Sequence, residues 1–243
     1  MTLAENTPEP TLPQGTELTL MGETFIAHPD GVLYWPGEAT LIVADLHLEK
    51  GSSFARRGTF LPPYDSRITL DRLARLAEVL RPDRLIALGD SFHDVEAANR
   101  LGTKDCATIM WLQQSCEWIW ISGNHDPHPP LELDGHACDE LSIGPISFRH
   151  EPLPGAKGEI AGHLHPCSKV RGRARSVRRP CFIEDGDRAI LPAFGALTGG
   201  LNICDDAFTT LFGAPDRVRI HMLGDQQIYS VGRHDCRPDA RRA

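Results

Sequence analysis

The sequence predicts an α/β protein made of two packed, mixed β-sheets flanked by helices, an αββα sandwich. Three observations lead to this prediction. Apolar runs alternate with helical patterns in the first half of the chain, short runs separated by Gly and Pro follow from residue 146, and several runs end at an aspartate or a histidine. An α/β half therefore precedes a β-rich half, without an internal repeat.

The strands and helices of the first half are expected to alternate. Each strand is a short apolar run bounded by turn residues, and each helix has its apolar residues on one face. Asp65 can cap the first helix, and Pro82 closes it. The expected strands are residues 17–28, 31–34, 41–44, 85–88 and 118–121, and the expected helices are residues 65–80 and within 103–116.

The second half is expected to form antiparallel or mixed strands, because Gly and Pro separate its apolar runs. These strands are residues 146–149, 159–162, 181–184, 189–191, 218–222 and 227–231.

Length and composition favour one domain. The 243 residues are 41% hydrophobic, which is enough for a substantial core. We expect this domain to span residues 16–232, between a flexible leader (1–15) and a flexible tail (233–243). No basic start with an apolar run indicates a secretion signal, and no run is long enough to span a bilayer.

Charge and cysteine content restrict the function further. A net charge of -8 argues against a surface that binds nucleic acid everywhere, although a local basic patch remains compatible with it. The seven cysteines form no CxxC pair, which favours reduced thiols and a cytoplasmic location.

Metal-ligand residues follow five separate strands. In an open α/β sheet the carboxyl ends of strands converge on a common crevice, so these residues are expected to meet. Two of the pairs are spaced two apart, which would put both side chains on one face if the backbone stays extended. The residues are Asp45 and His47, Asp90, Asn124 and His125, His150, and His163 and His165.

The donor types predict a catalytic metal centre. Carboxylate, amide and imidazole donors without thiolate suit manganese, iron or zinc at a catalytic site better than a structural zinc. Seven ligands are too many for one ion. Two ions roughly 3.5 to 4 Å apart would share them, with one carboxylate bridging, and would clamp a phosphate. For a single motif such as Asp45-x-His47, the alternative to metal binding is a carboxylate that caps a turn. For His150, the alternative is a role in packing or at the surface.

In content and order these segments resemble the calcineurin-like metallophosphoesterases. The matching segments are Asp45-x-His47, Gly89-Asp90, Gly123-Asn124-His125-Asp126, His150 and Gly162-His163-x-His165. The resemblance implies one metal held by Asp45, His47 and His165, and a second held by Asn124, His150 and His163. It further implies that Asp90 bridges them and that His125 stabilises charge or protonates the leaving oxygen.

One position departs from the general family pattern. The family usually continues Gly-Asp-x-x-Asp, whereas this chain has His93 at the place of the second aspartate. That aspartate normally orients the catalytic histidine. Either Asp94 takes over this task, or His125 is positioned differently.

A more specific resemblance is to the ligase-associated DNA damage response endonucleases, in which His93 looks normal. It implies a bacterial phosphodiesterase that acts on DNA in repair, is linked to a ligase and a helicase, and uses manganese, with zinc, iron and magnesium as alternatives. The matching segments are residues 34–36, 43–52, 55–58, 62–65, 88–94, 191–195 and 198–202.

Several basic residues are candidates for substrate contact, together with Asn124. Arg56 and Arg57 follow the first metal loop closely enough to reach a phosphate. Residues 169–179 are strongly basic, and Arg171 and Arg173 would share a face with Arg175 in an extended strand. A solvated loop and a solvated hairpin are the alternatives.

We therefore expect phosphodiester hydrolysis with DNA as the preferred substrate and no membrane association. One rival is a small-molecule phosphodiesterase or pyrophosphatase of the same fold, acting on a nucleotide or a lipid precursor in a confined pocket. The other is a non-catalytic scaffold, which would be expected to have lost ligands or the catalytic histidine. The sequence leaves the oligomeric state open.

Overall fold

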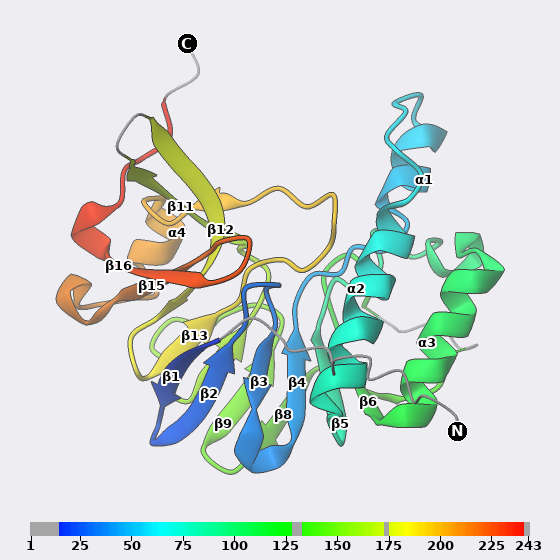
Figure 1. Cartoon of the computed structure of the whole chain (residues 1–243), viewed down its shortest axis with the longest axis horizontal. Helices are drawn as coiled ribbons and strands as arrows, with labels where there is room; N and C mark the ends of the chain where they lie inside the picture. Colours follow the sequence, from blue (N-terminus) through cyan, green and yellow to red (C-terminus); the bar gives the residue numbers. More distant parts are fainter. Residues whose placement is uncertain (1–14, 128–132, 173–174, 241–243) are drawn as a thin grey trace, which may run out of the picture.

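The computed structural model describes residues 15–127, 133–172 and 175–240. Its first sheet contains seven strands (Figure 1). The four N-terminal strands are antiparallel neighbours, and the last four of the sheet are parallel. In spatial order they are β1 (Thr16–Leu20), β2 (Glu23–Ala27), β3 (Leu33–Trp35), β4 (Thr40–Val43), β5 (Arg84–Leu88), β6 (Glu117–Ile121) and β7 (His136–Cys138).

The second sheet is mixed, as the sequence predicts. Its main path in spatial order is β14 (Leu201–Asn202), β11 (Pro166–Arg171), β12 (Ser176–Glu184), β13 (Arg188–Ile190), β10 (Glu159–Ala161), β9 (Ile146–Arg149) and β8 (Glu140–Ile143). The hairpin of β15 (Arg219–Leu223) and β16 (Ile228–Gly232) joins it through β12.

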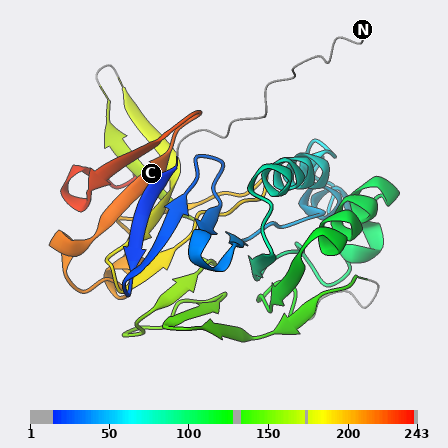
Figure 2. The same ribbon diagram turned by 60° about the horizontal axis from the view of Figure 1, so that its bottom comes forward.

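The longer helices lie together on one side of the molecule, and the strands of residues 166–232 lie on the other (Figure 2). The α-helices are α1 (Lys50–Arg56), α2 (Asp65–Leu80), α3 (Thr103–Ser115) and α4 (Asp206–Thr209). Short 3₁₀ turns are η1 (Pro36–Glu38), η2 (Ala98–Arg100), η3 (Pro215–Arg217) and η4 (Arg233–Asp235).

Successive side chains of the central strands face opposite sides of the first sheet and pack in different cores. In β4, Leu41 and Val43 pack in the core that includes the apolar residues of α2 and α3, whereas Ile42 packs in the core between the sheets. Because both faces are covered, β4, β5 and β6 are apolar after their first residue. A third core, which includes Phe208 of α4, covers the outer face of the second sheet. The four layers confirm the αββα prediction.

The structure also differs from the predicted elements. The strand expected at 17–28 is two strands, because Met21 and Gly22 have positive φ and reverse the chain. The strand expected at 181–184 begins at Ser176, so the basic stretch lies in a β11–β12 hairpin. Helix α1 and the strands β7, β8, β11 and β14 were not predicted.

The domain boundaries at residues 15 and 233 stay predictions. Part of the predicted flexible tail is attached to the second sheet, since Cys236 is buried and the Arg237 N–H donates to Lys169 O at 2.8 Å. Within the described ranges, every helix is too short or too polar to cross a membrane.

Candidate metal centre

The seven predicted ligands lie together at one edge of the two sheets. The parallel strands β4, β5 and β6 end side by side, and the loops after them carry Asp45, Asp90 and Asn124. The parallel strands β9 and β10 bring in His150 and His163 from the second sheet. The convergence expected from the sequence is therefore present.

One group of donor atoms surrounds His165. Its Nε2 lies 3.1 Å from Asp45 Oδ1 and 3.3 Å from His47 Nε2. Asp90 Oδ2 lies 3.8 Å from the same His47 nitrogen. Asp45 is fully buried, and His47 is 5% exposed.

A second group surrounds Asn124. Its Oδ1 lies 2.9 Å from His150 Nε2 and 3.0 Å from His163 Nδ1. These two ring nitrogens are 3.2 Å apart, and Asp90 Oδ1 is 3.4 Å from His150 Nε2. The two carboxylate oxygens of Asp90 therefore face different groups of donor atoms. This is the arrangement expected of a ligand that bridges two metal ions.

The ligand-bearing backbone is not extended, so the condition under which the paired ligands would share one face is not met. Asp45, His47, His163 and His165 have φ between 44 and 68°. Left-handed residues of this kind cost about 1–2 kcal/mol each. Hydrogen bonds hold the loops in place, among them His47 N–H to Asp90 O at 2.9 Å. Strain of this kind is typical of functional sites.

Two glycines allow the close approach of the loops. A Cβ on Gly123 would lie 2.1 Å from Asp90 N, and one on Gly162 would lie 2.7 Å from Asp45 Oδ2. Any larger residue would push a carboxylate loop out of position. The glycines in the Gly-Asn-His-Asp and Gly-His-x-His segments are therefore explained by packing around the ligands.

Burial and the two carboxylates set the protonation of the histidines. Burial lowers the pKa of His47 to about 3, so this ring is neutral and able to bind a metal. Burial also acts to lower the pKa of His150, but the hydrogen bond to Asp90 and the charge of Asp45 raise it overall. A proton on His150 thus supplies positive charge that a bound cation would replace.

The donor set fits two divalent cations. Two ring nitrogens lie 3.3 Å apart in the first group and 3.2 Å apart in the second, so in the unprotonated rings each pair can bind at a common point. A cation at each point would satisfy both pairs, and Asp90 would contact both cations. Oxygen and nitrogen donors without thiolate suit manganese, iron or zinc.

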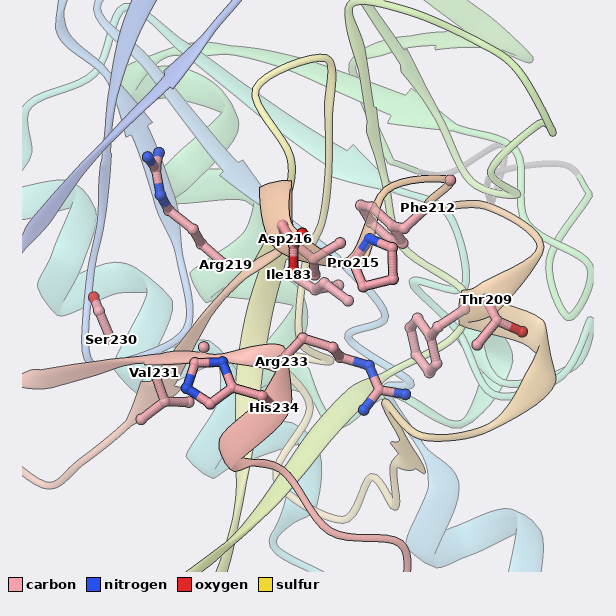
Figure 3. A pocket seen from close by; sticks show the side chains of 14 residues that line it. Ile183, Thr209, Phe212, Pro215, Asp216, Arg219, Ser230, Val231, Arg233 and His234 are labelled. Atoms are coloured by element: carbon pink, nitrogen blue, oxygen red, sulfur yellow. The ribbon is translucent and has the colours of Figure 1, made fainter.

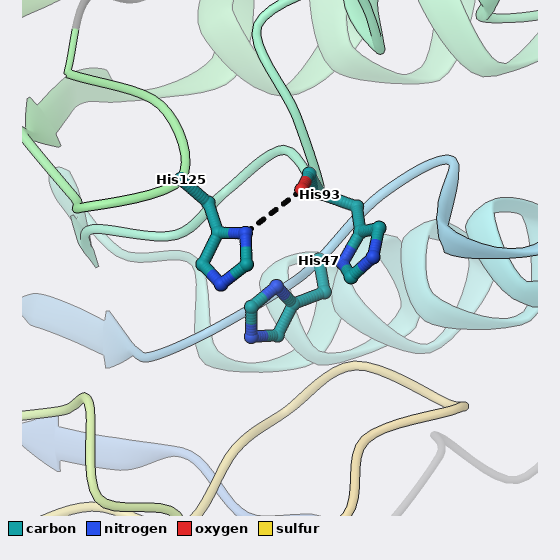
Figure 4. Close-up of side chains that lie close together, drawn as sticks. All are labelled: His47, His93 and His125. Atoms are coloured by element: carbon teal, nitrogen blue, oxygen red, sulfur yellow. Dashed lines mark hydrogen bonds between the residues drawn. The ribbon is translucent and has the colours of Figure 1, made fainter. Parts of the chain in front are cut away.

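His125 stands beside the first group, as Figure 4 shows. Its side chain is 41% exposed, and its Nε2 is 3.9 Å from Asp90 Oδ2. His125 Nδ1 lies 2.9 Å from the backbone oxygen of His93, to which it donates in that tautomer. The His93 ring stacks on His125 with centroids 5.3 Å apart.

These contacts show which group orients His125 in place of the aspartate that the family usually has. Asp94 does not take over from the usual aspartate, since it is held by Arg100 through contacts of 2.8 and 3.0 Å. The carbonyl oxygen of His93 orients His125 instead. A backbone acceptor cannot be recognised from residue type, which is why the sequence left this open.

Two residues around the centre were missed. Asp126 is buried, and its Oδ2 accepts the Phe92 N–H at 2.9 Å, which ties the Asp90 loop to the Asn124 loop. Burial raises the pKa of Asp126 to about 7. After burial, the positive charge of Lys50 contributes to lowering the pKa of His47 and of His93.

The basic candidates lie on two projections. Arg56 and Arg57 are exposed on and after α1, and Arg171 ends β11. Arg173 lies outside the described residues. Arg171 pairs in register with Ser176 of β12, and the shared basic face that includes Arg173 stays a prediction.

A cavity of about 900 Å³ lies away from this centre, between the segment of α4 and η3 and the segment of β16 and η4 (Figure 3). Its described lining includes Phe212, Arg219 and Arg233 but none of the seven candidate ligands. Cavity size therefore does not locate the chemistry, whereas the convergence of donor atoms does.

The chain is similar to the nuclease MPE of Pseudomonas putida, at 28% identity and a TM-score of 0.69, over 89% of this chain and 100% of that one. The chain has the fold of the calcineurin-like metallophosphoesterases. No protein-family model matches this metallophosphoesterase, and neither does any curated protein.

Two solved phosphoesterases are more distant from this metallophosphoesterase. YfcE of E. coli is 14% identical, with a TM-score of 0.39 over 79% of this chain and 98% of that one. A predicted phosphoesterase of Streptococcus pneumoniae TIGR4 is 14% identical, with a TM-score of 0.29 over 81% of this chain and 90% of that one.

Proposed function

We propose that this metallophosphoesterase is a two-metal phosphodiesterase that cleaves DNA. The observation that carries the proposal is the pair of donor groups that share Asp90, with the exposed ring of His125 beside them. The likeness to a solved nuclease supports the choice of a nucleic acid as substrate.

Each group has a role in the proposed reaction. Asp45, His47 and His165 would hold one cation, and Asn124, His150 and His163 would hold the other. Bound divalent cations, manganese in this proposal, would neutralise the phosphate and activate a water for in-line attack. Asp90 would keep the two cation positions at a fixed separation.

The protein's own groups would orient the substrate and move the proton. With Nδ1 of His125 donating to His93 O, its Nε2 is the nitrogen directed away from the backbone, and in the protonated ring it can protonate the leaving oxygen. Asn124 uses Oδ1 within the second group, so its amide N–H groups remain able to donate to a phosphate oxygen.

A polymeric substrate would lie between two projections. In Figure 1, α1 rises on one side of the strand ends and the β11–β12 hairpin rises on the other. Arg57 and Arg171 are candidates for contact with the phosphate backbone on the two sides. Arg56 stays a candidate from the sequence alone. A cytoplasmic role in DNA repair alongside a ligase and a helicase is part of the proposal and depends on the sequence resemblance.

The test compares three substrates. Purified protein is incubated with supercoiled plasmid, bis(p-nitrophenyl) phosphate and p-nitrophenyl phosphate, with and without Mn²⁺, alongside Asp90→Ala. Manganese-dependent nicking that Asp90→Ala loses supports the proposal. Cleavage of the small diester without nicking supports a small-molecule phosphodiesterase instead, and inactivity on every substrate contradicts catalysis.

A further inference from the structure

Basic side chains share one face of the β11–β12 hairpin. Side chains alternate between the two faces of a strand, so residues two apart lie on the same face. Lys169 and Arg178 stand directly opposite each other in register, and Arg171, two residues after Lys169, pairs with Ser176. Like charges that face each other across two antiparallel strands repel. This face is therefore suited to hold an anion between Lys169 and Arg178.

One carboxylate of the chain already lies at this position. Asp239 Oδ2 lies 3.1 Å from Arg178 Nε, and Asp239 Oδ1 lies 4.0 Å from Lys169 Nζ. The side chains of Asp239, Arg178 and Lys169 are 43, 38 and 25% exposed, so solvent reaches all of them. Ion pairs between groups that stay in contact with water are weak. An anion from outside can therefore compete with Asp239 for the two cations.

The segment that carries Asp239 is attached to the sheet independently of this carboxylate. Cys236 is buried, and the Arg237 N–H donates to Lys169 O at 2.8 Å. Asn202 Nδ2 donates to Arg237 O at 3.1 Å. In Figure 1 the described chain after η4 runs beside the two strands of the hairpin. The carboxylate of Asp239 can thus leave the two cations while the segment stays in place.

The two cations lie within reach of a polymer bound at the metal centre. Strand β11 begins directly after His165, and an extended chain spans the distance from His165 to Lys169 in about 13 Å. Arg178 Nη2 donates to Gly200 O at 2.6 Å, and the N–H of the next residue, Leu201, donates to His165 O at 3.0 Å. Because a DNA strand in B form has a phosphate about every 3.4 Å along its axis, a phosphate about four nucleotides from the cleaved bond would reach these cations.

We propose that Lys169 and Arg178 form a binding site for a DNA phosphate several nucleotides from the cleaved bond, and that Asp239 occupies this site until DNA displaces it. This inference rests on the proposed function and extends it to the part of the substrate away from the metal centre. Phosphate contacts of this kind add affinity without reading the base sequence. The carboxylate of Asp239 therefore acts as an internal competitor of the substrate.

The experiment measures kcat/KM of the manganese-loaded enzyme on two substrates. Supercoiled plasmid can reach the metal centre and the hairpin together, whereas bis(p-nitrophenyl) phosphate has one phosphate and cannot. Asp239→Asn, Lys169→Gln and Arg178→Gln are compared with the wild type. The matched controls are Arg179→Gln and Asp225→Asn, because these two residues form an ion pair at 3.3 Å and Arg179 lies on the opposite face of β12. Thermal unfolding checks that each variant is folded.

On plasmid, we expect Asp239→Asn to raise kcat/KM about threefold, because the phosphate no longer competes with a carboxylate. Lys169→Gln and Arg178→Gln should each lower kcat/KM about fivefold, since each loses one charge-assisted contact with phosphate. Adding Arg178→Gln to Asp239→Asn should reduce the slope of log kcat/KM against log salt concentration by about 0.9. Both controls on plasmid, and every variant on the small diester, should stay within about twofold of the wild type.

The gain in Asp239→Asn should be absent once both cations are removed, so this substitution is also made in Lys169→Gln/Arg178→Gln. An equal gain there, or a gain in the wild type no larger than that of Asp225→Asn, would indicate a general effect of charge and overturn the site. Losses in Arg178→Gln that Arg179→Gln matches, or that extend to the small diester, would also overturn it. A wild type that nicks no plasmid overturns the proposed function and the site with it.

Discussion

Replacing His125 by alanine should separate substrates by their leaving group. The structure leaves one ring nitrogen able to give up a proton, Nε2, because Nδ1 faces His93 O at 2.9 Å. Proton donation contributes about 10²–10⁴-fold when the leaving group is a sugar alkoxide. A nitrophenolate needs no proton, so that contribution should be absent for bis(p-nitrophenyl) phosphate.

The assay measures kcat for DNA cleavage and for the small diester on the same manganese-loaded protein. We expect His125→Ala to lose about 10²-fold or more on DNA and to stay within about threefold of the wild type on the small diester. Metal content is measured in parallel. It should not change, because the backbone N–H of residue 125, which donates to Asp90 Oδ1, is kept in His125→Ala.

The variant Asp94→Asn tests whether Asp94 or the His93 carbonyl oxygen orients His125. Since Asp94 is held by Arg100, its substitution should cost less than about tenfold on either substrate. Equal losses of His125→Ala on both substrates would refute the leaving-group role. A loss in Asp94→Asn as large as that in His125→Ala would refute orientation by the His93 carbonyl.

Three further predictions follow from the packing. Gly123→Ala should abolish manganese binding, measured by calorimetric titration, because the new Cβ would lie 2.1 Å from Asp90 N; retained stoichiometry would contradict this. Glu159→Ala should lower the free energy of unfolding by about 3 kcal/mol in urea titrations, since it leaves the buried Arg188 without its carboxylate; a change below 1 kcal/mol would contradict this. The hydrogen bond from its arginine partner lowers the pKa of Asp94 from 3.8 to about 2, so the folded state prefers the ionised form. The stability advantage of the wild type over Asp94→Asn should therefore be present at pH 5 and shrink as pH falls below about 4, and an advantage independent of pH would argue against the ion pair.

The central part of the fold could be predicted from the sequence because burial on both faces leaves a clear pattern. Strands β4, β5 and β6 are apolar after their first residue, and a polar ligand follows within three residues of the end of each strand. The convergence of Asp45, Asp90 and Asn124 followed from this pattern and from the geometry of parallel strands.

Helix α1 could not be predicted, because its stability comes from tertiary contacts. Its sequence contains one glycine and two serines in seven residues, which are poor helix formers. Hydrogen bonds to side chains of α2 hold its start: Glu49 N–H donates to Ser66 Oγ at 2.8 Å, and Gly51 N–H donates to Asp65 Oδ2 at 3.0 Å. Arg57, which directly follows α1, was therefore noticed only as a loop arginine.

The left-handed conformations of the ligand loops also could not be predicted from the sequence. Residues spaced two apart suggest an extended segment, but Asp45 and His47 both have positive φ, and cross-loop hydrogen bonds hold them. The short strand β7 is largely exposed and lacks an apolar pattern, and β8 has only two apolar residues in alternation, so pairing with neighbours defines both.

Anomalous diffraction from crystals soaked in Mn²⁺ tests the metal centre most directly. We predict two peaks about 4 Å apart, one beside His165 and one beside Asn124, with the carboxylate of Asp90 between them. A single peak, or peaks away from Asp90, in crystals of protein that cleaves phosphodiesters in solution would contradict the account.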